Sequence, residues 1–154
     1  GLVSYGATLM VFGNRVEGSF LRLSQGKEAP TAIAWGEFDR LALVRLPITA
    51  TAPDGRAISP PTIELRLPDG SAHPHLLLAG IAQSLIAGRS VPDVDGLLAA
   101  TASAVVRTDP THAPRLPRNP HDVADALSAT RGMLEAGGVF SSALIDRLLD
   151  ALRR

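Results

Sequence analysis

The sequence has 154 residues with 45% hydrophobic content, enough for one compact domain with a modest core. Fifteen Lys and Arg residues balance fifteen Asp and Glu residues, so net charge gives no reason to expect a nucleic acid or a membrane as partner. No apolar run is long enough to cross a bilayer, and no charged region with a small-residue cleavage site opens the chain. Because cysteine is absent, disulfides and thiolate metal sites are excluded, and we expect a cytoplasmic protein.

The first half is predicted to begin with a helix and to continue in strands. Residues 1–12 have the apolar spacing of a helix. Alternating or β-rich patterns predict strands over residues 31–36, 40–47 and 63–67. Gly36 and Asp39, between the first two strands, are typical of a hairpin connection. The triplet Pro53-Asp54-Gly55 predicts a turn in the loop that precedes the third strand.

The second half is predicted to be helical. Helices are expected over residues 74–87, 93–105 and 121–135, followed by a last helix capped by Ser141 or Ser142. The first of these helices has almost no polar face, so we expect it to lie buried between two layers. Thr108–Pro120 contains four prolines and predicts an extended connector. Strands followed by helices indicate an α+β fold.

Two segments of the first half carry charge that a buried strand would not. The first is a polar loop from Arg22 to Glu28, in which Gly26 allows an unusual backbone angle. The second is the predicted strand that holds Arg40 and Arg45. Arginine is suited to forked recognition of carboxylate and phosphate, so both segments are candidates for anion binding.

The third charged segment is the predicted strand 63–67. Strand alternation places Glu64 and Arg66 on one face, and we expect that face to open into a concavity shared with Arg45 or Arg22. In a cleft, Glu64 would be a hard oxygen ligand suited to Mg²⁺ or Mn²⁺. Arg66 beside it would neutralise a phosphate or carboxylate that bridges to the metal.

Two alternatives stay open at this point. Glu64 and Arg66 could instead form a solvated sheet face, paired with Arg45 or with each other, because most exposed ion pairs do little. His73 and His75 could hold a metal, but histidines that flank a helix-opening proline are more often surface or cap residues. The residues alone therefore indicate a face that could grip an anionic substrate together with a divalent cation.

The same three segments, in this order, resemble the catalytic domain of glutamine synthetases and related γ-glutamyl ligases. SFLRLSQGKEAP at 19–30 resembles the family's Asn-Ser-Tyr-x-Arg-Leu-x-x-Gly-x-Glu-Ala-Pro loop. AWGEFDRLALVRLP at 34–47 resembles the strand pair with the Asn-Arg-x-x-x-x-Arg signature. IELRLPDGSAHPHL at 63–76 resembles the Glu-x-Arg strand and the helix start that follows it, and residues 116–149 resemble the closing helices. The resemblance covers nearly the whole chain.

The resemblance implies an ATP-dependent reaction in which a glutamate-like carboxylate is activated as an acyl phosphate and then amidated by ammonia or another amine. Arg22 would bind the substrate carboxylate. Glu28 would lie on a flap that shields the intermediate and helps to deprotonate ammonium. Arg66 would contact the γ-carboxylate during its phosphorylation. These roles are implied by the family and not by the spacing.

The cofactors implied by the resemblance are ATP and Mg²⁺ or Mn²⁺. Arg40 and Arg45 would hold the ATP phosphates and stabilise the transferring group, and Glu64 would be one metal ligand. The other metal-binding glutamates, an ATP-site histidine and a small β-domain belong to an N-terminal part that has no counterpart in this chain. The family also implies a homo-oligomer.

Several positions depart from the family's motifs. Gly18 replaces the asparagine before the serine of the first motif, and Asp39 replaces the asparagine before the first arginine of the signature. Thr62 removes a basic residue before the Glu-x-Arg strand, and Lys27 replaces the flap aromatic. Gly18 and Thr62 favour an alternative, in which the chain is a catalytically inactive binding or assembly module of the same fold.

We therefore interpret residues 1–154 as the C-terminal portion of a glutamine synthetase-like catalytic domain. The expected architecture is α+β, with part of a curved antiparallel sheet first and packed helices after it. We expect the chain to contribute one part of the active site of an ATP-dependent carboxylate–amine ligase, and we expect it to be inactive alone. A ligase that uses an amine other than ammonia is an equal variant of this hypothesis.

Overall fold

The structure is a computed structural model that describes residues 1–25, 27–110 and 114–154. Its helices are α1 (Leu2–Gly13), α2 (Glu17–Ser24), α3 (Pro74–Gly88), α4 (Val94–Thr101), α5 (Ser103–Thr108), α6 (Pro120–Glu135) and α7 (Ser142–Leu152). Its strands are β1 (Trp35–Glu37), β2 (Val44–Leu46) and β3 (Glu64–Leu65), and a short 3-10 turn, Ala136–Gly138, follows α6. The predicted α+β class is confirmed. The backbone angle predicted for Gly26 lies outside the described residues.

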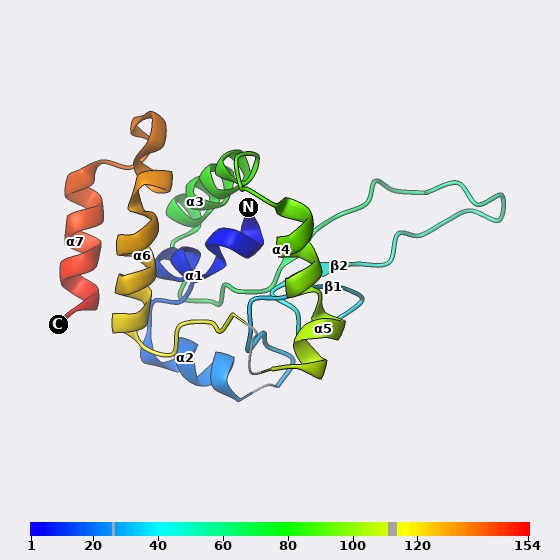
Figure 1. The fold of residues 1–154 in the computed structure, drawn as a ribbon, viewed down its shortest axis with the longest axis horizontal. Coiled ribbons are helices and arrows are strands. Elements are labelled where there is room, and N and C mark those ends of the chain that lie inside the picture. Colours follow the sequence, from blue (N-terminus) through cyan, green and yellow to red (C-terminus); the bar gives the residue numbers. More distant parts are fainter. Residues whose placement is uncertain (26, 111–113) are drawn as a thin grey trace.

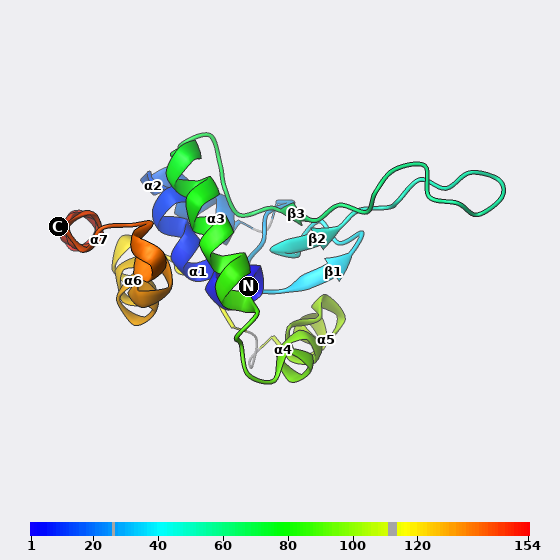
Figure 2. The same cartoon turned by 90° about the horizontal axis from the view of Figure 1, so that it is seen from above.

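The elements form two groups that lie side by side (Figure 1). Helices α1, α3, α6 and α7 pack together in one group, with α2 beneath α1. The small sheet forms the other group together with α4 and α5, which lie on one side of the sheet when the molecule is seen from above (Figure 2). None of the helices in the described part of the chain is long and apolar enough to span a membrane.

The helix boundaries follow local sequence signals. Helices α3 and α6 each begin with a proline in the first turn, where its missing N–H costs nothing. The Ser141 side chain accepts a hydrogen bond from the Leu144 N–H, which confirms the predicted cap of α7. Gly137 and Gly138, which follow α6, have positive φ angles of 66° and 72°, so the chain leaves this helix in the left-handed conformation that glycine adopts easily.

The core is centred on α1, which packs against α3 and α6. Leu9, Met10 and Phe12 of α1 are almost fully buried. A Cβ atom at Gly80 of α3 would lie 3.0 Å from the rings and methyl groups of Phe12 and Leu9, so this glycine lets the two helices approach closely. The Phe12 ring stacks on Phe140 with centroids 5.1 Å apart, which joins α1 to the segment before α7.

The prediction that α3 would be buried on most sides is wrong. Its inner face, which includes Leu77, Gly80 and Gln83, packs against α1 and α6. Its outer face leaves the large apolar side chains of Leu78 and Ile86 each 64% exposed. The apolar side chains do run round the whole helix, but the described residues supply only one of the two layers that such a pattern suits.

The sheet has the order β1-β2-β3, and it contains one parallel and one antiparallel pair. Strands β2 and β3 are antiparallel, with Arg45 opposite Glu64. Strands β1 and β2 are parallel, with Trp35 opposite Val44, so the predicted hairpin between them is wrong. Because β1 and β2 have only three residues each, the loop 38–43 has to return over only about 10 Å before the chain runs in the same direction again.

Two further segments of the first half bear on the sequence predictions. Arg22 lies in the last turn of α2 and not in a loop, which corrects the predicted extent of the polar loop. Residues 47–63 project from the sheet as a long arm (Figures 1 and 2). At its tip the Asp54 carboxylate accepts a hydrogen bond of 3.0 Å from the Arg56 N–H, which confirms the predicted turn.

The predicted helix over 93–105 is present as two helices, α4 and α5, which are separated at Ala102. The side chain of Asp93 caps the first of them by accepting a hydrogen bond from the Gly96 N–H. Of the predicted connector 108–120, residues 111–113 lie outside the described residues. Residues 114–119 form no helix, and Arg115 makes an isolated bridge to Ala32.

The packing of α1 gives a direct test of the core. Phe12→Ala should lower the free energy of unfolding by about 3–5 kcal/mol, because the ring is buried and its stack with Phe140 is lost. The matched control is Leu78→Ala on the exposed face of α3, which should change the free energy by no more than about 0.5 kcal/mol. Urea denaturation of the three proteins measures both values. Equal losses in the two variants would contradict this description of the core.

Candidate active site

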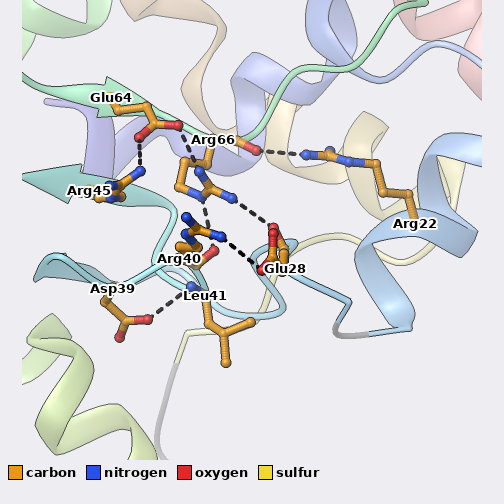
Figure 3. Close-up of polar contacts among 8 residues, drawn as sticks. All are labelled: Arg22, Glu28, Asp39, Arg40, Leu41, Arg45, Glu64 and Arg66. Carbon is orange, nitrogen blue, oxygen red and sulfur yellow. Dashed lines mark hydrogen bonds and ion pairs between the residues drawn. The ribbon is translucent and has the colours of Figure 1, made fainter. Parts of the chain in front are cut away.

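The six residues that the sequence singled out come together in one cluster (Figure 3). They arrive from separate parts of the chain, namely the end of α2, the loops before β1 and β2, strand β2 and strand β3 with the residue after it. Hydrogen bonds and ion pairs connect every member to at least one other member or to its backbone. The cluster consists of Arg22, Glu28, Arg40, Arg45, Glu64 and Arg66.

Glu64 is the central acceptor of the cluster. Its Oε2 accepts a hydrogen bond of 2.8 Å from Arg45, which stands opposite it in the antiparallel pair of β2 and β3. Its Oε1 accepts a bond of 2.7 Å from Arg66, two residues along the same face. The Arg45 and Arg66 side chains are only 23% and 15% exposed, so these ion pairs are partly withdrawn from water. Strand alternation thus places Glu64 and Arg66 side by side as predicted, and their pairing with Arg45 and with each other is the one that the alternative interpretation gave.

Arg66 uses all three guanidinium nitrogens at once. Besides the bond to Glu64, its Nε donates to the backbone carbonyl of Arg40 at 2.9 Å, and its Nη2 donates to the backbone carbonyl of Glu28 at 2.8 Å. One planar fork therefore fixes strand β3 to both neighbouring loops. Sequence reasoning missed these contacts, because any residue can present a backbone carbonyl and no residue type marks it.

The outer part of the cluster is more open to solvent. Arg40 and Glu28 form an ion pair of 3.0 Å, with side chains 61% and 69% exposed. Glu28 has a φ angle of 52°, a left-handed conformation that is uncommon for a residue other than glycine. Arg22 donates two hydrogen bonds to the backbone carbonyls of Leu67 and Arg66, at 3.0 and 3.1 Å, and so holds the end of β3.

The charge of the cluster favours an anion. Four guanidinium groups face two carboxylates, which leaves a formal excess of two positive charges. The Nε of Arg45 is buried and has no hydrogen-bond partner among the described residues. A buried donor without a partner is costly, and an acceptor brought by a ligand would remove that cost. The arrangement suits a phosphate or carboxylate group bound by several forked donors.

A divalent cation fits the described residues less well. Both oxygens of Glu64 already accept hydrogen bonds from arginines, and no group of three carboxylates or imidazoles gathers among residues 1–25, 27–110 and 114–154. The Nδ1 of His73 caps α3 by accepting a bond from the Leu76 N–H, and the His75 ring lies edge-on to it at 6.2 Å. The cap interpretation is therefore confirmed for His73, and His75 is an exposed residue of the first turn of α3.

The chain matches a family described as "Glutamine synthetase, catalytic domain" over residues 1–153. It belongs to this family. The membership that three short motifs predicted is thus confirmed over nearly the full sequence. The six clustered residues all lie within the matched range.

Two curated relatives illustrate the similarity to glutamine synthetases. The glutamine synthetase of Streptomyces filamentosus is 34% identical over 161 residues, which cover 99% of this chain and 32% of that protein. The glutamine synthetase of Mycobacterium bovis is 32% identical over 155 residues, which cover 95% of this chain and 30% of that protein. The chain therefore spans about a third of the length of the curated relatives that it matches.

Solved structures show the same fold. A Plasmodium falciparum glutamine synthetase aligns with a TM-score of 0.74 at 19% identity, over 99% of this chain and 36% of that one. A complex of GmaS with ADP aligns with a TM-score of 0.63 at 24% identity, over 99% of this chain and 33% of that one. The α+β arrangement of this chain is therefore a glutamine synthetase fold.

The central position of Glu64 predicts a measurable loss of stability. Glu64→Gln should lower the free energy of unfolding by about 1–2 kcal/mol, because it leaves two partly buried guanidinium groups without a charged acceptor. Chemical denaturation measures the loss. Asp146→Asn serves as the control, since it breaks the exposed ion pair with Arg131 and should have little effect. A control effect as large as that of Glu64→Gln would contradict a structural role for the cluster.

Proposed function

We propose that this chain supplies the carboxylate- and phosphate-binding part of an ATP-dependent carboxylate–amine ligase site of the glutamine synthetase type. The observation that carries the proposal is the connected cluster with its excess of two positive charges and its unpartnered Arg45 Nε. Formation of an acyl phosphate brings two anions into contact, so the reacting atoms need compensating charge. The acid would be glutamate-like, and the nitrogen donor would be ammonia or another amine.

In this proposal each arginine of the cluster binds a particular anionic group of ATP or of the substrate. Arg40 and Arg45 hold phosphates of ATP, which supplies the activating phosphoryl group when bound. Arg66 contacts the γ-carboxylate. Each Nη nitrogen carries two hydrogens, and Arg66 uses one hydrogen on each in its present contacts, so a second set remains for a ligand. Arg22 likewise retains its Nε–H and one hydrogen on each Nη for the substrate carboxylate.

Glu28 is the proposed proton acceptor of the site. Its Oε1 accepts the bond from Arg40, which leaves Oε2 to take a proton from the ammonium or amine. The loop that carries Glu28 is tied to Arg66 through its backbone carbonyl, so the side chain can move while its backbone stays in place. The left-handed conformation of Glu28 is consistent with a functional constraint at this position.

The proposed metal site is incomplete within the described residues. Mg²⁺ and Mn²⁺ take about six oxygen ligands, of which carboxylates are a part. Glu64 is the one candidate that the cluster offers, and its oxygens are shared with Arg45 and Arg66. We propose Glu64 as one ligand, with the remaining carboxylates supplied from outside the described residues.

The proposed partners follow from the share of the fold that this chain represents. The chain spans about a third of its curated relatives, which supports a site completed by the N-terminal part of the same enzyme. The exposed apolar face of α3, with Leu78 and Ile86, is a surface that further protein would cover. Assembly into a homo-oligomer is part of the same proposal.

The competing function is that of a catalytically inactive binding or assembly module. Nucleotide binding by the completed enzyme separates the two, because a ligase must bind Mg²⁺–ATP and an inactive module need not. Retention of all six charged residues in one connected cluster supports the ligase.

Activity should depend on the parts that this chain lacks. Residues 1–154 alone should show no ATP-dependent amide formation and should bind Mn²⁺ weakly, because one carboxylate cannot hold the ion. Mixing the chain with its N-terminal partner, or using the full-length enzyme, should restore both. Release of phosphate from ATP in the presence of glutamate and ammonium measures turnover. Robust turnover by the isolated chain would contradict the shared site.

In the restored enzyme, Arg66→Ala should lower kcat about 10²–10³-fold, because Arg66 would act on charge that develops during phosphoryl transfer. The matched control is Arg131→Ala, which also removes a guanidinium that donates through all three nitrogens, but to Glu135 and Asp146 on another surface. That variant should keep the wild-type kcat. An Arg66→Ala enzyme that changes only KM would place Arg66 in ground-state binding instead.

A further inference from the structure

The peptide group between Arg40 and Leu41 is held from both ends. Its carbonyl oxygen, on Arg40, accepts the 2.9 Å hydrogen bond from Arg66 Nε. Its N–H, on Leu41, donates a 2.9 Å hydrogen bond to Oδ1 of Asp39 (Figure 3). Because the peptide is planar, these two bonds together fix the orientation of the backbone from which the Arg40 side chain leaves.

Asp39 is in turn anchored to helix α5. Its other oxygen, Oδ2, pairs with the Arg107 guanidinium, and the Ser103 hydroxyl also hydrogen-bonds the carboxylate. The Asp39 side chain is only 10% exposed, whereas Arg107 lies largely in solvent. Burial alone would raise the pKa of Asp39, but the bonds from Leu41, Ser103 and Arg107 outweigh it and hold this pKa below its usual value.

The junction between α5 and the sheet leaves no free space. A Cβ atom at Gly36 of β1 would lie 2.4 Å from the Ser103 hydroxyl and 3.1 Å from the Cβ of Asp39. Helix α5 therefore sits directly against β1 where the loop to β2 begins. No residue of α5 belongs to the cluster, but the position of α5 influences the orientation of Arg40 through the contacts of Asp39.

We propose that Asp39 is a positioning residue, which orients Arg40 for anion binding by tying the Arg40–Leu41 peptide to Ser103 and Arg107 of α5. The role rests on the proposed function of the cluster as an anion site. The proposal also explains why Asp39 can stand where the family's motif has asparagine. An aspartate accepts from the Leu41 N–H and pairs with Arg107, whereas an asparagine keeps the first contact without the charge.

The test compares the affinity of the 154-residue chain for pyrophosphate with hydrogen exchange at the Leu41 amide. Asp39→Ala should weaken pyrophosphate binding about 3–10-fold and speed exchange at Leu41, because an orienting hydrogen bond is lost. Asp39→Asn should restore Leu41 protection and most of the affinity. Arg107→Ala should weaken binding about 2–4-fold with Leu41 still protected, because it removes one of the two contacts of Asp39 with α5 and leaves the one with Ser103.

The matched control is Asp54→Ala at the tip of the arm. It removes the same kind of contact, a carboxylate that accepts from the N–H two residues later, away from α5. Its pyrophosphate affinity should equal that of the wild type. Faster exchange at Leu41 in Asp39→Ala with unchanged affinity would overturn the positioning role and leave Asp39 as a structural residue.

The wild-type chain separates this proposal from the one on which it rests. If the wild type binds no pyrophosphate, the anion site itself is overturned and the role of Asp39 falls with it. If the wild type binds and Asp39→Ala binds equally well, only the role of Asp39 is overturned. If Asp39→Ala does not fold, as judged by circular dichroism, Arg107→Ala decides the question, and an unchanged affinity in that variant overturns the proposal.

Discussion

The candidate site depends on the three-way contact made by the Arg66 guanidinium. One rigid fork donates to the Glu64 carboxylate and to the backbone carbonyls of Arg40 and Glu28. These acceptors belong to three different segments, and two of those segments are loops with no strand or helix of their own. Because the fork is planar and its donors are fixed relative to one another, it can be satisfied on all sides only if the segments keep one arrangement.

That constraint also has an electrostatic consequence. Arg45 and Arg66 place positive charge beside Glu64 in a partly buried position, where each charge loses some of its hydration. Such an arrangement is a weak way to stabilise a fold, since a hydrophobic cluster of the same size would do as well. It is a suitable way to prepare a site for phosphate and carboxylate groups, because the donors are already oriented when the anion arrives.

The sequence was sufficient for features that depend on local signals. Proline, serine and paired glycines marked the ends of α3, α6 and α7, and strand alternation placed Glu64 beside Arg66. The parallel pairing of β1 with β2 could not be read, because the turn signals at Gly36 and Asp39 also suit a hairpin and the strands are very short. The contacts of Asp39 with α5 could not be predicted either, because its partners Ser103 and Arg107 lie more than sixty residues away in the chain. The exposed outer face of α3 shows the opposite limit, because a sequence pattern states that a surface needs cover but not which residues provide it.

The proposed role of the cluster as an anion site is tested most directly by following the arginine side chains themselves. ADP should be titrated into the isotope-labelled chain while the Nε–H signals of its arginines are recorded by nuclear magnetic resonance. If the cluster binds the anion, saturable shifts are expected at Arg40, Arg45 and Arg66, with the largest at Arg45, because its Nε has no hydrogen-bond partner among the described residues. The signal of Arg131, paired with Glu135 and Asp146 on another surface, should stay in place. Equal, unsaturated shifts at all arginines, or no shift at the cluster, would contradict the proposed anion site.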